Sequence, residues 1–293
     1  PMRSVIQAAD QALATAAGDE LAQVQRLSKD IKDAIYKVGV DEARWLVDTY
    51  YQLQHDRITS AARIRSMLKD DATEPHALMT WLFKQYETLE NQIKLSLDRY
   101  SDNFDAGEWA KDQIGIGPVI AAGLIANINP EHCQHAASVW RYAGLAPHYD
   151  WNKGEKRPWN ARLKTLCAYK MGESFVKTCN HPEAFYGKIY KQRKELETLR
   201  NDNLEFADQA KAKLEKFNIG KTTEAYKHYS IGKLPPAHIH ARARRVAVKL
   251  FLSHFSQVYY ETVIGKPASQ IYAIKYLEHD DYITPIGYTP LVA

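Results

Sequence analysis

The chain has 293 residues, of which 45% are hydrophobic and 25% charged, and its net charge is +4. This length suffices for one large domain or two smaller ones with buried cores. No apolar run approaches the roughly 18 residues of a membrane span, and the first residues lack the pattern of a signal peptide. Three cysteines, Cys133, Cys167 and Cys179, form no CxxC pair, so we expect reduced thiols and a cytoplasmic protein.

Positive charge is concentrated in two segments. Residues 151–200 contain twelve Lys or Arg against five Glu and no Asp, and residues 235–260 contain four Lys or Arg and no acid. Local basic surfaces of this kind favour a polyanionic partner. Solvated helix faces are the alternative interpretation of each segment.

Residues 1–100 predict a helical region. Two segments, 40–68 and 76–97, carry apolar residues at three- and four-residue spacing, and Pro75 separates them. The first stripe begins with Trp45, and the second contains Leu78 and Leu82. Alternation with a period of two, which would indicate strands, is scarce.

The stretch WAKDQIGIGPVIAAGLIANI, which starts at residue 109, breaks a helix pattern with Gly-Ile-Gly-Pro. Inside a helix a glycine costs about 1 kcal/mol and a proline about 3, so two helices meet here. The pattern is that of a helix-hairpin-helix motif. We expect Ile116 to fill the hairpin, and the backbone at Gly115, Gly117 and Val119 to face outward and bind a phosphate. A plain turn that binds nothing is the alternative.

Turn signals follow the hairpin closely. Asn129 and Pro130 predict either the cap and first position of a helix or the end of a short turn, and Gly144 predicts the end of the helix. A loop follows, and Asn160 predicts the cap of the next helix.

The segment WNKGEKRPWNARLK interleaves two tryptophans with basic residues. Cations bind backbone phosphates, and an indole can stack on an unpaired base. The alternative is that at least one of Trp151 and Trp159 anchors the loop in the core. The candidate contacts are Lys153, Lys156, Arg157, Arg162 and Lys164.

QIGIGPVIAAGLIANI, followed by VWRYAGLAPHYDWNKG, resembles the C-terminal region of DEDD-type insertion-sequence transposases. These are RNA-guided enzymes that pair a RuvC-like domain with a serine domain. The resemblance covers about residues 113–175, and the YAGLAP segment at 142–147 is its most specific part. It implies DNA handling in a mobile-element or phage setting.

The resemblance does not extend to the catalytic residues of the family. The family's four acidic residues lie on strands of an α/β domain, whereas residues 1–100 show a helical pattern. Lys153-Gly154 stands where the family has Ser-Gly, so the expected nucleophile is absent. We therefore assign no catalytic residue and do not favour an enzyme.

The remaining chain again reads as helices. Residues 182–218 predict one long helix or two with a joint at 201–203, and their dense mixed charge indicates an exposed helix or coiled-coil arm. Residues 218–236 predict a linker. Residues 237–265 predict the clearest helix, ended by a glycine, and residues 270–277 a short strand.

The helix predicted at 237–265 carries one basic stripe. His238, Arg242, Arg245 and Lys249 recur at intervals of four, three and four residues, beside two apolar stripes. Two apolar faces predict a largely buried helix. Its basic stripe is then either an exposed ridge that contacts nucleic acid or a row paired with acids elsewhere.

Metal and cofactor signals are weak. The His and Cys residues around Cys133, and the pair His238 and His240, lack the spacing of a structural zinc site. No nucleotide-binding glycine loop follows a strand pattern. We therefore expect no metal and no cofactor.

The sequence thus predicts a mainly α protein: an N-terminal helical bundle, a central helix-hairpin-helix module and long C-terminal helices, divided at 1–100, 101–180, 181–265 and 266–293. We expect it to bind nucleic acid, DNA rather than RNA, by structure more than by sequence. It could form a homo-oligomer through its long helices, and no membrane partner is expected. The alternatives are a strand-transfer enzyme or nuclease with an unrecognised nucleophile, and a factor that acts on host machinery through protein contacts.

Overall fold

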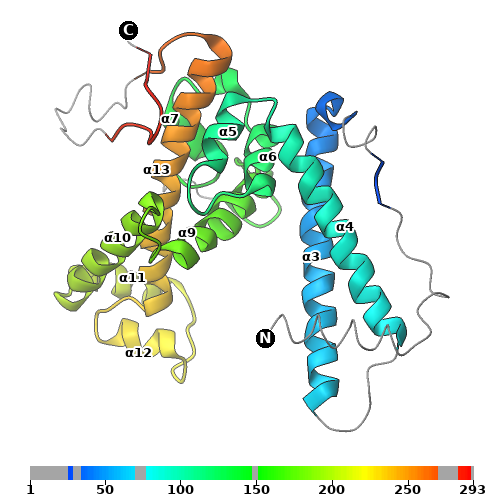
Figure 1. The fold of residues 1–293 in the computed structure, drawn as a ribbon. Coiled ribbons are helices and arrows are strands. Elements are labelled where there is room, and N and C mark those ends of the chain that lie inside the picture. Colours follow the sequence, from blue (N-terminus) through cyan, green and yellow to red (C-terminus); the bar gives the residue numbers. More distant parts are fainter. Residues whose placement is uncertain (1–25, 29–33, 70–76, 147–150, 270–282, 292–293) are drawn as a thin grey trace. The chain divides into compact units, whose positions relative to one another are not determined.

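The computed structural model describes residues 26–28, 34–69, 77–146, 151–269 and 283–291, and every regular element in these ranges is a helix (Figure 1). The prediction of a mainly α fold is confirmed. The strand expected at 270–277 lies outside the described residues. In the same ranges, no helix combines the length and the hydropathy that crossing a bilayer requires. The chain divides into two compact units, residues 1–104 and 105–293.

The first unit is a helical hairpin. A 3-10 turn, η1 (Ile35–Lys37), precedes α3 (Val40–Lys69) and α4 (Ala77–Ser101), which pack along each other. Ala61, Ile64 and Phe83 form a small core between them. An ion pair between Arg57 Nε and Glu90 Oε2, 2.5 Å long, also joins α3 to α4.

Some of the predicted apolar stripe of the first unit is not buried. Trp45 is 64% exposed and Leu78 is 56% exposed, while Ala43 and Val47 are buried instead. Two helices alone bury one narrow stripe each, so part of a wider apolar face stays in contact with solvent.

The second unit is built around α13 (Pro236–Ile264), a long helix that is buried over most of its length. Helices α5 (Asp105–Lys111), α7 (Ala136–Tyr142), α9 (Gly172–Thr178) and α10 (Phe185–Asp202) pack against it (Figure 1). Phe251 of α13 lies at the centre of this core. Its ring contacts those of Trp109, Phe175 and Tyr186 at centroid distances of 5.6, 5.7 and 5.0 Å.

The hairpin joins α5 to α6 (Pro118–Asn127), whose residues are buried from Val119 onward. After it come a 3-10 turn, η2 (Pro130–His132), and α7, where a single helix was expected. Both predicted caps are confirmed: Asn129 Oδ1 accepts from the Glu131 amide at 3.0 Å, and Asn160 Oδ1 from the Leu163 amide at 3.1 Å.

The next three elements follow one another without a gap. They are α8 (Ala161–Thr165), the π-helical segment η3 (Leu166–Met171) and α9. We refer to them together as the 161–178 run. Its two ends lie beside opposite ends of α6. Asn160 Nδ2 lies 3.3 Å from Asn127 Oδ1, and a Cβ on Gly115 would lie 3.1 Å from Thr178 Oγ1.

The charged region after residue 182 forms two helices, α10 and α11 (Ala207–Lys216), so the two-helix alternative holds. The expectation of an exposed arm is wrong for α10, because Tyr186, Tyr190 and Glu197 are buried and the helix packs on α13. The predicted linker contains α12 (Glu224–Ser230). The signal missed there was the cap Thr223, whose hydroxyl accepts from the Tyr226 amide at 3.2 Å.

Residues 283–291 belong to the core of the second unit. The Ile286 carbonyl accepts from Trp109 Nε1 at 2.8 Å, and the Ile283 carbonyl lies 2.8 Å from His254 Nε2. The buried Glu261 carboxylate accepts from the Tyr288 hydroxyl and from a backbone amide of the same segment. These contacts fix the segment to α5 and α13.

Candidate nucleic-acid interface

The hairpin has the backbone that the sequence predicts. Gly115 has a φ of +101°, in the left-handed region that favours glycine. The Ile116 amide donates to the Gln113 carbonyl at 2.9 Å and closes the turn. The Ile116 side chain is buried, as expected for the residue that fills the hairpin. Gly117 then adopts extended backbone and caps α6, with Pro118 in the first helical position.

Three backbone amides of this bend make no hydrogen bond within the described residues. Within the described chain, no hydrogen-bond acceptor is found for the amides of Gly115, Gly117 and Val119. A Cβ on Gly117 would meet no atom within 4 Å, so open space lies in front of the bend. The Val119 side chain is buried, so only its backbone can reach a ligand. Free amides at a helix start suit an anion.

A second set of candidate residues meets around Gly144. The end of α7 is a Schellman motif, in which the Leu145 amide donates to the Trp140 carbonyl at 2.9 Å and Gly144 has a φ of +64°. A Cβ on Gly144 would lie 2.8 Å from the Trp159 ring and 2.9 Å from Lys164 Cδ. The glycine of the YAGLAP segment therefore lets the basic loop pack on α7.

Three cations of this region lie over indole rings. Lys164 Nζ is 4.2 Å from the Trp159 ring centroid, and Arg157 Cζ is 5.2 Å from that of Trp151. From α13, Lys249 Nζ lies 3.9 Å from the ring of Trp140. Such cation–π contacts hold the charges in place without neutralising them.

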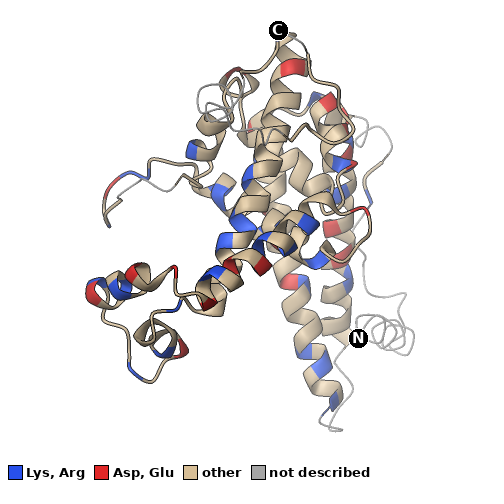
Figure 2. Ribbon diagram, turned by 90° about the vertical axis from the view of Figure 1, so that its left-hand side faces the viewer, with Lys and Arg blue, Asp and Glu red and all other residues tan. Residues whose placement is uncertain are grey.

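The loop and α13 share one electrostatic environment, in which Arg245 is the common neighbour. Burial lowers the pKa of Lys164, and the charges of Arg245 and Arg157 lower it further. Burial and Arg245 likewise lower the pKa of Lys249. Each shift requires that the cations lie near one another. Figure 2 shows the Lys and Arg positions of the chain in blue.

We name one set of these residues the tryptophan–cation surface: Arg157, Lys164, Arg245, Lys249, Trp140, Trp151 and Trp159. In the part of the chain that the structure describes, none of its four cations has a carboxylate partner. The sequence left open whether the stripe on α13 is an exposed ridge or is paired with acids. Arg245 is exposed, whereas Lys249 is half-buried under the Trp140 ring contact.

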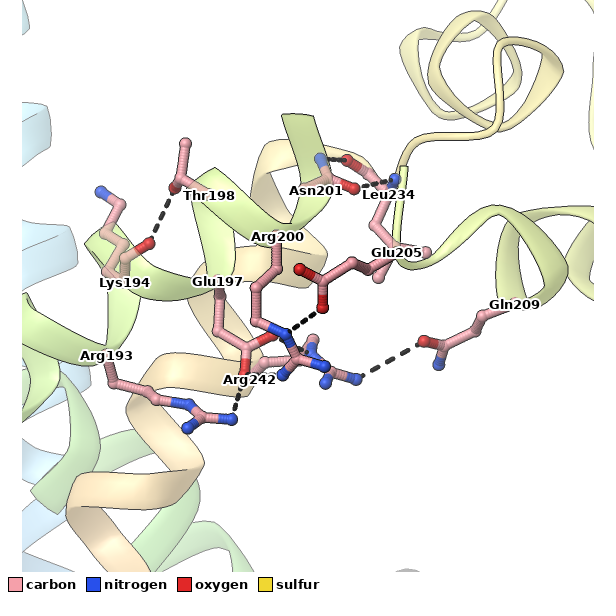
Figure 3. Close-up of polar contacts among 10 residues, drawn as sticks. All are labelled: Arg193, Lys194, Glu197, Thr198, Arg200, Asn201, Glu205, Gln209, Leu234 and Arg242. Atoms are coloured by element: carbon pink, nitrogen blue, oxygen red, sulfur yellow. Dashed lines mark hydrogen bonds and ion pairs between the residues drawn. The ribbon is translucent and has the colours of Figure 1, made fainter. Parts of the chain in front are cut away.

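Arg242, on the same predicted stripe, is placed differently. Its Nε lies 2.7 Å from Oε2 of the buried Glu197, and its guanidinium covers the Phe206 ring at 4.4 Å. Figure 3 shows Arg193 and Arg200 converging on the same carboxylate. The charge of Arg242 thus serves the packing of α10 on α13, and we leave Arg242 out of the surface.

The other candidates of the loop, Lys153, Lys156 and Arg162, are exposed. The hairpin and the tryptophan–cation surface are not adjacent, because they lie at opposite ends of α6. Ten helical residues span about 15 Å. The two sites are therefore separate anion contacts.

Two lysines of the 161–178 run were not among the sequence candidates. Lys177 is exposed and precedes Thr178, the residue that lies against Gly115. Burial lowers the pKa of Lys170, and the charge of Lys177 lowers it further, so the two ammonium groups are neighbours. The excess of basic residues over 151–200 included both lysines, and the fold places them on the run whose last residue lies beside Gly115.

Two of the three cysteines lie inside the second unit. Cys133 and Cys167 are buried, and burial raises the pKa of Cys133 to about 12. Among the residues that are described, no group of three or more His, Cys, Asp or Glu side chains could hold a metal ion.

Comparison of the chain with protein-family models, with curated proteins and with solved structures gives no match.

Proposed function

We propose that this chain binds nucleic acid through the tryptophan–cation surface and the hairpin amides. The observation that carries the proposal is the convergence of four cations without carboxylate partners, brought from the 151–164 loop and from α13. Cations that are not neutralised within the protein can replace the counterions condensed on a nucleic acid when they bind its phosphates. The release of these counterions drives association.

The two contacts favour recognition of structure over sequence. Backbone amides and cations bind phosphates, and phosphate contacts set position without reading bases. Two anion sites at opposite ends of a helix about 15 Å long select a strand path that reaches both. The resemblance to insertion-sequence transposases supports DNA over RNA and a mobile-element or phage setting.

The first test reverses two exposed charges of the surface. We expect Arg157→Glu with Arg245→Glu to weaken binding about a hundredfold or more, because two phosphate contacts become repulsive. The slope of log affinity against log salt should fall by about 2. The measurement is an electrophoretic shift series over duplex, single-stranded and branched DNA and RNA, at two salt concentrations.

The control for the double charge reversal makes the same change in net charge outside the tryptophan–cation surface. Lys211 and Lys221 are exposed on and beside α11, and Lys211→Glu with Lys221→Glu should weaken binding far less. If both double variants bind as the native protein does, the proposal is wrong. Equal losses in both would reduce the interface to net charge alone and would also contradict it.

The second test addresses the hairpin separately. Gly117 has an extended φ of −102°, and open space surrounds its Cβ position, so Gly117→Glu should fold normally. The new carboxylate would compete with phosphate for the bare amides, and we expect a loss of about tenfold in affinity. Gly117→Gln is the matched control for size. Unchanged affinity of the Glu variant would remove the hairpin from the interface.

A further inference from the structure

Tyr169 is a large aromatic side chain that belongs neither to the tryptophan–cation surface nor to the hairpin. It is 58% exposed, and it lies on η3, the π-helical part of the 161–178 run. Segments with π-helical hydrogen bonding are rare in proteins and are frequent at functional sites.

The Tyr169 ring is held in place from one side. Arg244 Cζ lies 5.4 Å from its centroid, and the guanidinium of Arg244 is itself fixed by an ion pair with Glu173. Arg244 reaches this position by crossing Gly172, where a Cβ would lie only 2.8 Å from its Cγ and Cδ. The missing side chain of Gly172 thus allows Arg244 to support the ring. A supported ring loses little freedom when a ligand stacks on it.

Tyr169 belongs to the same run as Lys164 of the tryptophan–cation surface and Thr178 beside the hairpin. Along the run it is five residues after Lys164 and nine before Thr178. Its supporting residue, Arg244, lies in the field of Arg245, because the charge of Arg245 lowers the pKa of Arg244 after the larger effect of burial. Tyr169 therefore shares its run with one cation of the surface, and its supporting arginine is the sequence neighbour of another.

We propose that Tyr169 stacks on an unpaired base, which makes a single strand of nucleic acid the substrate class of this interface. The inference rests on the proposed function, since the cations must first hold the strand. A duplex keeps the faces of its bases inside the stack, whereas a single strand offers them to aromatic side chains.

The test compares Tyr169→Ala with Tyr169→Phe. The probes are labelled oligothymidylate, oligouridylate, and the oligothymidylate annealed to its complement. For the Ala variant we expect the ratio of single-strand to duplex affinity to fall about tenfold, as for the loss of one stacked base. The Phe variant keeps the ring and should retain the ratio. Tyr36→Ala removes a tyrosine that is 48% exposed in the first unit and serves as the control.

The outcomes separate the two proposals. If Arg157→Glu with Arg245→Glu weakens binding but Tyr169→Ala leaves the ratio unchanged, the stacking inference is overturned and the proposed function stands. An equal loss on duplex and single strand also overturns it, since stacking acts on unpaired bases. If the charge reversal has no effect on any probe, the proposed function itself is wrong. A fall in the ratio with either single strand supports the inference.

Discussion

Replacing Glu197 with alanine is expected to destabilise the second unit by about 3–5 kcal/mol. The carboxylate is 1% exposed and accepts from Arg242 at 2.7 Å and from Arg193 at 2.5 Å (Figure 3). Burial raises the pKa of Glu197, but the hydrogen bonds and charges of Arg242 and Arg193 outweigh it and hold the pKa below its usual range. The group is therefore ionised at neutral pH, and its removal leaves two half-buried guanidinium groups without their partner.

The measurement is urea unfolding followed by far-ultraviolet circular dichroism. Glu195→Ala, two residues away on the exposed face of α10, is the matched control and should change stability by less than about 0.5 kcal/mol. The double variant Glu197→Ala with Arg242→Met should be more stable than the sum of the two single changes predicts, because the ion pair couples them. A strictly additive result would show that the pair does not join α10 to α13.

The stability of the second unit should also fall in mild acid because of His254. This ring is 2% exposed, and its Nε2 donates to the Ile283 carbonyl at 2.8 Å, so Nδ1 accepts from the Tyr186 hydroxyl at 2.7 Å. Burial lowers the pKa of His254 from 6.5 to about 4, although the hydrogen bond to the Ile283 carbonyl opposes the shift. The native state thus holds this ring neutral.

The sign follows from proton linkage. Above pH 6.5 neither state binds a proton at this ring, and the stability that depends on it is fully present. Between pH 6.5 and about 4 the unfolded chain takes up the proton and the native state does not, so about 3 kcal/mol is lost as the pH falls.

Thermal unfolding across this range checks the effect. In His254→Gln the decline between pH 6.5 and 4 should be shallower than in the native protein, even though the variant is less stable at pH 7. His132→Gln changes an exposed histidine and should keep the native slope. Parallel profiles for all three proteins would mean that His254 does not carry the acid response.

Much of the fold was predictable because its signals are local. The spacing of apolar residues gave α3, α4 and α13, and the caps at Asn129 and Asn160 need only the neighbouring backbone. The hairpin was predictable for the same reason, since Gly115 requires a positive φ that few other residues adopt. Helix α12 was not predicted, because the glycines and prolines that flank its short segment are typical of a linker.

The candidate site was predictable only in part. The basic loop and the stripe on α13 each have a signal in the sequence, but their meeting depends on packing between residues almost a hundred positions apart. The same packing pairs Arg242 with Glu197, whereas Arg245 lies beside Lys164 on the tryptophan–cation surface. Neither the role of Gly172 nor the exposure of Tyr169 has a local signature, because each depends on where Arg244 crosses the 161–178 run.

The attachment of residues 283–291 to α5 has a consequence for how the protein reaches its native state. Trp109 and its acceptor at Ile286 are 177 positions apart in the chain. Closing so long a loop costs entropy before any contact rewards it, and such topologies fold slowly. Gln113, the residue whose carbonyl closes the hairpin turn, donates to the same Ile286 carbonyl at 3.5 Å. We therefore expect the contact between the bend and residues 283–291 to form late in folding, whereas the turn itself is closed by a local hydrogen bond.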